Sequence, residues 1–90
     1  MKVLNMTLDT EYQLAYAYLA SGKVARTIEV NQTINIDVKE NGEPFGVEFL
    51  CFDSLNHTKD ALLAENNQLT DAELEAVLVA QEKVRERLAD

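Results

Sequence analysis

Apolar and polar residues alternate along the first half of the chain, which is the pattern expected of half-buried β-strands. Residues 34–39 give the clearest case, Ile-Asn-Ile-Asp-Val-Lys. Turn-forming residues such as Asp, Asn, Ser and Gly interrupt this pattern at intervals. We therefore predict five strands, over Lys2–Leu8, Leu14–Leu19, Val24–Val30, Ile34–Glu40 and Pro44–Phe52.

The connections between these strands are short, which favours antiparallel neighbours. Asn41-Gly42 is a strong hairpin signal, because a type I′ turn needs positive φ at both central positions. A two-residue turn there places Val38 opposite Phe45, so that apolar side chains meet on one face. A similar turn at Ser21-Gly22 would join the second strand to the third. The prediction is an antiparallel five-stranded meander.

The period of the pattern changes after residue 53. A short helix is predicted over Thr58–Ala64, and Thr70 with Glu73 fits a capping box at the start of a longer helix. The apolar stripe of that helix is interrupted by Gln81. Its members are Leu74, Val77, Leu78, Val84 and Leu88. We predict the α+β class in a single domain over 1–90, with the sheet in 1–53. One or two C-terminal helices from 54–90 should pack on one sheet face.

The second predicted strand is apolar on both sides. Ala15 and Ala17 point to one face, where small side chains allow a helix to approach closely. Leu14, Tyr16 and Tyr18 point to the other, which is less polar than a solvent-facing sheet surface normally is. We predict that these three residues form the interface of a homo-oligomer, with a dimer as the simplest case.

Charge and cysteine content exclude several classes. The net charge is −8 and no basic patch is visible, so nucleic-acid binding is not expected. The longest uncharged stretch, Tyr12–Gly22, is too short for a membrane span, and no secretory signal is visible. A single cysteine fits a reducing compartment. These features predict a cytoplasmic protein without a membrane association.

Candidate chemistry is sparse. Asp9, Asp37 and Glu48 could line a carboxylate site, although a turn explains Asp9 and a solvated sheet face explains the other two. Cys51 and His57 are the only cysteine and histidine. Cys51 shares the inward parity of Phe49, so we expect it to be buried and inert rather than paired with His57 as a nucleophile. Neither a metal nor another cofactor is expected.

Several short segments resemble, in order, the motifs of the domain-of-unknown-function family 2283 (DUF2283). They lie at about residues 3–50, before the helical tail. The segments are Asp9-Thr10-Glu11, Leu14–Leu19, Gly22-Lys23-Val24, Thr27–Val30, Asn35-Ile36-Asp37 and Gly42–Leu50. Gln13, Ala15 and Ala17 depart from the family pattern. The resemblance implies a fold rather than a reaction, and an antitoxin-like or partner-binding role.

From these observations we expect a non-enzymatic protein-interaction module that acts as a homo-oligomer and binds a protein partner. The alternative is a small enzyme or ligand-binding protein that uses Asp9, Asp37 and Glu48.

Overall fold

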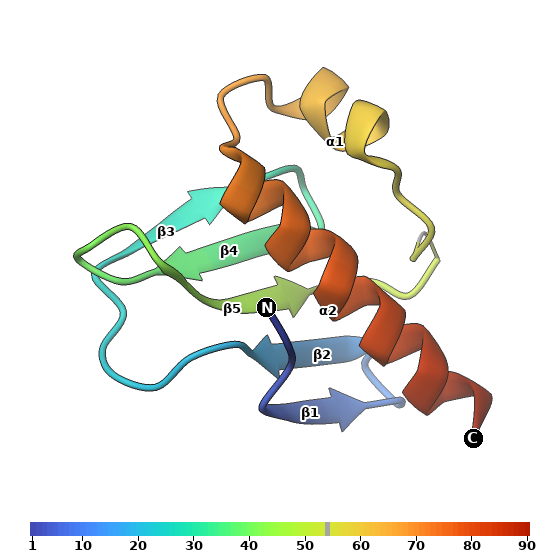
Figure 1. The fold of residues 1–90 in the computed structure, drawn as a ribbon. Coiled ribbons are helices and arrows are strands. Elements are labelled where there is room, and N and C mark those ends of the chain that lie inside the picture. The colour runs from blue at the N-terminus through green and yellow to red at the C-terminus, as the bar shows by residue number, and fades with distance from the viewer. Residues whose placement is uncertain (54) are drawn as a thin grey trace.

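The computed structural model describes residues 1–53 and 55–90 and confirms the α+β class. Five strands form one antiparallel sheet, followed by two helices (Figure 1). The strands are β1 (Asn5–Asp9), β2 (Leu14–Tyr18), β3 (Arg26–Glu29), β4 (Ile34–Val38) and β5 (Pro44–Phe49). The helices are α1 (Lys59–Glu65) and α2 (Asp71–Ala89). None of the described helices has the length and apolar character needed to cross a bilayer.

The order of the strands differs from the predicted meander. The observed order is β1-β2-β5-β4-β3, so β5 lies between β2 and β4 and β3 forms an edge. A hairpin at Ser21-Gly22 would have placed Arg26 beside Ala17, at the centre of the buried face, whereas at the edge of the sheet Arg26 pairs with Val38 and stays exposed. Instead Ala17 pairs with Val47, and both are fully buried. The segment after β2 crosses to the far edge of the sheet as a loop, in which Val24 is 45% exposed.

The β4–β5 hairpin has the predicted register in its interior but not at its turn. Ile34 pairs with Phe49 and Ile36 with Val47. At the turn, the Gly42 N–H donates to Lys39 C=O at 2.9 Å and Gly42 has φ +89°. Asn41 is not among the described residues with positive φ, so this is not a type I′ turn. It is the three-residue connection in which a glycine with positive φ follows a type I turn.

An irregularity next to this turn restores the register. Val38 pairs with Pro44, and the pairing shifts by one residue before Asp37 meets Gly46. The predicted pairing of Val38 with Phe45 is therefore wrong. A bulge absorbs one extra residue and keeps the apolar side chains of the rest of β5 on the buried face.

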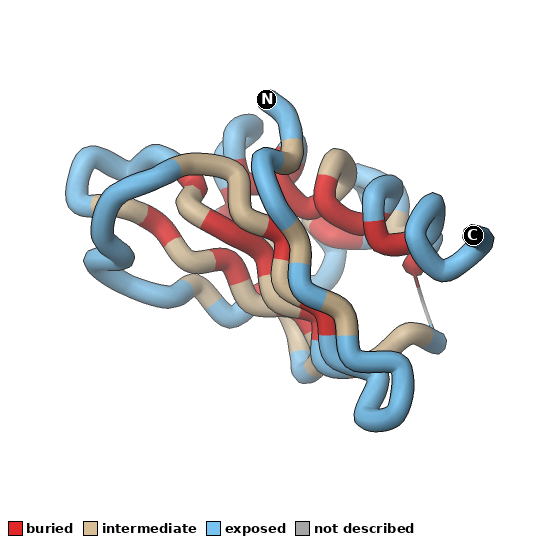
Figure 2. The backbone as a smooth tube through the Cα atoms, turned by 90° about the horizontal axis from the view of Figure 1, so that it is seen from below, coloured by how far each residue is buried: buried red, intermediate tan, exposed pale blue. Residues whose placement is uncertain are grey.

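Helix α2 crosses one face of the sheet and contacts β2, β4 and β5, as predicted for the longer helix (Figure 1). Ala15 and Ala17 are buried beneath it, in keeping with the close approach expected of small residues. Figure 2 shows the buried positions gathered between the sheet and this helix. The capping box at its start is confirmed, because Thr70 and Glu73 bind each other's backbone N–H groups.

Gln81, which interrupts the apolar stripe of α2, fastens the segment that leads into α1. Its Oε1 accepts from His57 N–H at 3.1 Å and its Nε2 donates to His57 C=O at 2.7 Å. The Gln81 side chain is buried, and both of its polar groups are satisfied by the backbone of one residue, His57. Arg85, one turn later, donates to Leu55 C=O at 3.2 Å. The polar residues of this helix face therefore hold Leu55 and His57, which belong to no helix or strand.

Candidate functional site

The sheet face opposite α2, called the outer face here, contains most of the candidate residues. Strand pairing and side-chain alternation place twelve positions on it. They are Asn5, Thr7, Asp9, Leu14, Tyr16, Tyr18, Thr27, Glu29, Asn35, Asp37, Gly46 and Glu48.

A hydrogen-bonded group occupies the centre of the outer face. The Tyr16 hydroxyl donates to Asp37 Oδ2 at 2.5 Å, and the Thr27 hydroxyl donates to Asp37 Oδ1 at 2.6 Å. Tyr16 is on β2 and Asp37 is on β4, so the tyrosine reaches across β5 at Gly46. A Cβ atom on Gly46 would lie 2.6 Å from Tyr16 Cζ. The glycine is needed because the phenol ring occupies the space above it.

The environment of Tyr16 favours its protonated form. Burial is the main cause, and the hydrogen bond to Asp37 and the charge of that carboxylate act in the same direction. Together they raise the pKa of Tyr16 above its ordinary value. The Tyr16 hydroxyl is therefore a hydrogen-bond donor at neutral pH rather than a general base.

This shift predicts a loss of stability in alkali. Below pH ~10, the ordinary pKa of tyrosine, Tyr16 is protonated in both the folded and the unfolded chain. Above it the unfolded chain loses the proton first, so the contribution of Tyr16 falls as pH rises toward its raised folded pKa. At pH 7 we expect Tyr16→Phe to lower the free energy of unfolding by about 1.5–3 kcal/mol, the scale of a hydrogen bond to a charged group.

Urea unfolding of the parent and Tyr16→Phe between pH 8 and 11 measures this effect. The difference between the two proteins should narrow as the pH passes 10. Tyr18→Phe, which removes a hydroxyl from the same strand, is the control. A parent-minus-mutant difference that stays constant to pH 11 would contradict the prediction.

Aromatic rings and a second polar pair extend the outer face on either side of this group. The Tyr16 and Tyr18 ring centroids are 4.7 Å apart, and Tyr18 meets Phe45 edge-on at 6.0 Å. Between the adjacent strands β4 and β5, Asn35 Nδ2 donates to Glu48 Oε1 at 3.1 Å. Leu14, at the start of β2, is 41% exposed. The outer face thus combines fixed aromatic rings with exposed aliphatic surface.

The three carboxylates of the alternative hypothesis do not form one site. Asp37 and Glu48 are both on the outer face, but each is engaged by a different partner. Asp9 Oδ1 accepts from the backbone N–H groups of Glu11 and Tyr12, both at 3.0 Å, which confirms the turn interpretation. Asp9 and Glu48 do line one shallow depression of about 280 Å³ beside Leu14. Asp37 is not among its lining residues.

Cys51 and His57 bind other groups rather than each other. Cys51 follows the end of β5 and is partly buried, so the prediction that it is a buried inward residue of the strand is wrong. Its Sγ accepts from Asp53 N–H at 3.3 Å. His57 Nε2 lies 4.0 Å from Glu65 Oε1, and its Nδ1 is buried without a hydrogen-bond partner among the residues that the structure describes. Within residues 1–53 and 55–90, no cluster of three His, Cys, Asp or Glu side chains could hold a metal ion.

The sequence did not reveal the link from Tyr16 to Asp37. The available signal was Gly46, because a glycine inside a strand marks a bulge or a close approach by another group. Tyr16 and Asp37 both have the parity of the outer face, and they lie on the strands that flank β5. Using this signal would have required the order of the strands. The assumed meander kept β2 away from β5.

Comparison with known proteins gives a family and no activity. The family model described as "Protein of unknown function (DUF2283)" matches residues 5–52, which span all five strands. The two helices lie beyond the match. Neither a curated protein nor a solved structure matches the chain. Because the match covers more than half of the 90 residues, the chain belongs to the DUF2283 family.

Proposed function

We propose that this protein is a non-enzymatic interaction module that acts as a homo-oligomer, with the outer face as the contact surface between two copies. The observation that supports this proposal is a patch of the outer face, formed by Leu14, Tyr16 and Tyr18, that neither helix covers, since α2 packs on the opposite face. Leu14 and Leu50 are 41% and 40% exposed at one end of it. Two-fold symmetry provides each copy with a matching apolar surface.

The fixed position of the rings favours binding. Tyr16 is held by Asp37 and by contact above Gly46, and Tyr18 packs between Tyr16 and Phe45. Tyrosine provides a large contact area while its hydroxyl remains hydrated or hydrogen-bonded. Side chains that are already ordered lose less conformational entropy on association. This arrangement suits recognition better than catalysis.

Charge on the outer face sets the salt dependence of self-association. Its strand positions include four acids, Asp9, Glu29, Asp37 and Glu48, and neither lysine nor arginine. Stacking two such faces brings like charges together, and salt screens that repulsion. Self-association should therefore strengthen as ionic strength rises. The same acids disfavour binding to phosphate backbones.

A second candidate follows from the same charges. An antitoxin-like role would require a heterologous partner, and an acidic aromatic face is complementary to a basic protein surface. Binding of that kind weakens as salt rises, which is the opposite of the salt response expected for self-association. The carboxylate-site alternative has less support, because Asp9, Asp37 and Glu48 each have a hydrogen-bond partner within the chain.

We expect Leu14→Lys to disrupt the oligomer. The Leu14 side chain is exposed and lies at one end of the proposed contact, so a lysine there should fold normally and put a charged, hydrated side chain into the apolar part of the contact. Tyr16 and Tyr18 are poorer positions for this test, because Tyr16 also stabilises the sheet. Light scattering at tens of micromolar should give a parent mass that is a multiple of 10.1 kDa and a lower mass for the variant.

Val24→Lys is the matched control. Val24 is 45% exposed and lies in the loop that follows the opposite end of β2. This variant should retain the parent mass. A parent that is monomeric at these concentrations would rule out the homo-oligomer and leave the basic partner as the occupant of the outer face.

A further inference from the structure

The two edges of the sheet differ in how they are protected. Edge strand β3 has four residues with Arg26 and Glu29 at its ends, and Asn66 Nδ2 donates to Glu29 C=O at 3.2 Å. Edge strand β1 has five residues, Asn-Met-Thr-Leu-Asp, with one charge at its end. It contains neither proline nor lysine, the residues that commonly prevent edge pairing. β1 is therefore the less protected edge.

Hydrogen bonding shows which residues of β1 point their main-chain N–H and C=O groups away from the sheet, where a second chain could reach them. The Leu19 N–H donates to Phe45 C=O at 2.8 Å, so Ala15, Ala17 and Leu19 direct their peptide groups toward β5. Alternation then directs those of Leu14, Tyr16 and Tyr18 toward β1.

Their partners on β1 are Asp9, Thr7 and Asn5, whose peptide groups consequently face β2. Met6 and Leu8 must direct theirs away from the sheet. The Met6 N–H agrees with this, because it donates to the Asn5 side chain at 2.9 Å.

We propose that β1 pairs antiparallel with β1 of a second copy around a two-fold axis at Thr7. This inference rests on the proposed self-association and adds a contact that uses the sheet edge instead of the outer face. The pairing places Met6 opposite Leu8 of the second copy, and Leu8 opposite its Met6. Each of these pairs exchanges two main-chain hydrogen bonds, for which the Met6 N–H changes its acceptor from the Asn5 side chain to Leu8 C=O of the second copy.

Side-chain register supports the pairing. Met6 and Leu8 are partly buried on the α2 side of the sheet and pack against the core, so the pair continues the apolar layer from one copy into the next. On the outer face, Thr7 meets Thr7, a cross-strand pair that can hydrogen-bond. Asn5 meets Asp9, so no like charges are directly opposed. A shift of one residue would exchange the two faces and lose this match.

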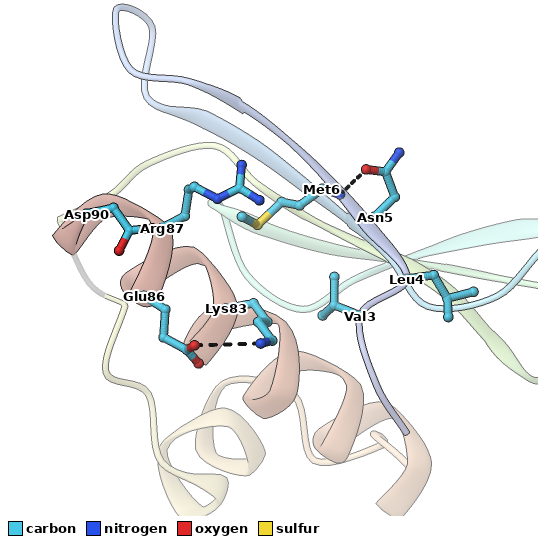
Figure 3. Close-up of a pocket in the computed structure, with 8 residues that line it drawn as sticks. All are labelled: Val3, Leu4, Asn5, Met6, Lys83, Glu86, Arg87 and Asp90. Atoms are coloured by element: carbon cyan, nitrogen blue, oxygen red, sulfur yellow. Dashed lines mark hydrogen bonds and ion pairs between the residues drawn. The ribbon is translucent and has the colours of Figure 1, made fainter.

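A groove beside β1 leaves room for the second copy. It measures about 370 Å³ and lies between the N-terminal half of β1 and the last turns of α2 (Figure 3). Met6 and Leu4 line it together with Lys83 and Arg87, and no β2 residue takes part, so it lies on the edge side of the sheet. Leu4 is 58% exposed there. The side chain of Leu8 from the second copy, placed opposite Met6, would enter this space.

Cysteine cross-linking tests the axis directly. In a Cys51→Ser background, Thr7→Cys places two thiols opposite each other at a non-hydrogen-bonded pair. Cα atoms there are about 4.5 Å apart, within the range for a disulfide. Asn5→Cys is the matched control on the same strand and face. Its thiols would be separated by four residues of strand, about 13 Å. Mild oxidation should give at least ~10-fold more covalent dimer for Thr7→Cys than for Asn5→Cys. Equal yields, or no dimer from Thr7→Cys, overturn the proposal.

A second measurement is independent of the cysteine variants. Hydrogen exchange at the Leu8 amide should slow as the parent is concentrated, because the pairing gives this N–H an acceptor. A Leu8 amide that exchanges equally fast at all concentrations overturns the edge contact.

The Leu14→Lys variant separates this proposal from the preceding one. Cross-linking of Thr7→Cys that persists after Leu14→Lys supports the edge contact whether or not the outer face associates. If Leu14→Lys lowers the mass of the oligomer while Thr7→Cys gives no covalent dimer, the edge contact is overturned and the outer-face contact is retained. If Thr7→Cys no longer cross-links once Leu14→Lys is added, β1 does not pair on its own, and the proposal of an edge contact separate from the outer face is overturned.

Discussion

Replacing Gly46 by alanine is expected to lower the free energy of unfolding by about 2–4 kcal/mol, although a methyl group is normally a small change. The added Cβ would overlap the Tyr16 ring, which lies between it and the solvent. Overpacking of this kind costs about 1–3 kcal/mol. Displacement of the ring would also break the hydrogen bond to Asp37, whose acceptor is charged. Urea unfolding of the variant measures the sum.

A double-mutant cycle shows whether the cost comes from Tyr16. Once Tyr16→Ala has removed the ring, Gly46→Ala should cost less than about 1 kcal/mol, because the space above Gly46 is then open. If Gly46→Ala is equally destabilising in both backgrounds, strain elsewhere in β5 is responsible and the ring is not. The same cycle measures how strongly β2 and β4 are coupled across the strand between them.

Gln81→Leu is expected to be similarly destabilising, although leucine would complete the apolar stripe of α2. The substitution leaves both the N–H and the C=O of His57 without the partners that Gln81 provides. Each unsatisfied buried polar group costs about 1–3 kcal/mol, reduced here because His57 is only partly buried. We therefore expect a loss of about 2–4 kcal/mol and faster hydrogen exchange at the His57 amide.

Gln68→Leu provides the matched control. Gln68 is exposed, so the same substitution there should change the stability by less than about 0.5 kcal/mol. If Gln81→Leu is as stable as the parent, or more stable, the hydrogen bonds to His57 contribute little and helix packing dominates at this position.

Local features of the fold were predictable from the sequence because they depend on near neighbours in the chain. Side-chain alternation identified every strand, and the register of Ile34 and Ile36 against β5 followed from matching apolar positions. Thr70 and Glu73 identified the start of α2 because a capping box involves a few consecutive residues. Leu14, Tyr16 and Tyr18 do lie on the outer face, since parity within a strand determines the face.

The order of the strands was not predictable by the same reasoning. Ser21-Gly22 has the composition of a hairpin turn, and only the global requirement to keep Arg26 at an exposed edge, away from the centre of the buried face, argues against one. That requirement depends on the position of α2, which a local pattern does not contain. The prediction of a type I′ turn at Asn41-Gly42 was wrong for a related reason, because the bulge that follows this turn is set by the packing of β5. The hydrogen bond between Tyr16 and Asp37 depends on the strand order and on the register of β5 against β4.

The position of β5 between β2 and β4 has a consequence for the order of folding. Strands β3, β4 and β5 are joined by short turns, as are β1 and β2, so each group can form from contacts close in sequence. The β2–β5 pairing must instead close a loop of about 30 residues, such as that between Ala17 and Val47. Because α2 contacts β2, β4 and β5, it bridges this junction from the end of the chain. The rate-limiting step should then be the docking of the β1–β2 hairpin onto the three-stranded β3–β4–β5 unit under the final helix. Mutations at the β2–β5 junction should slow folding more than those within either unit.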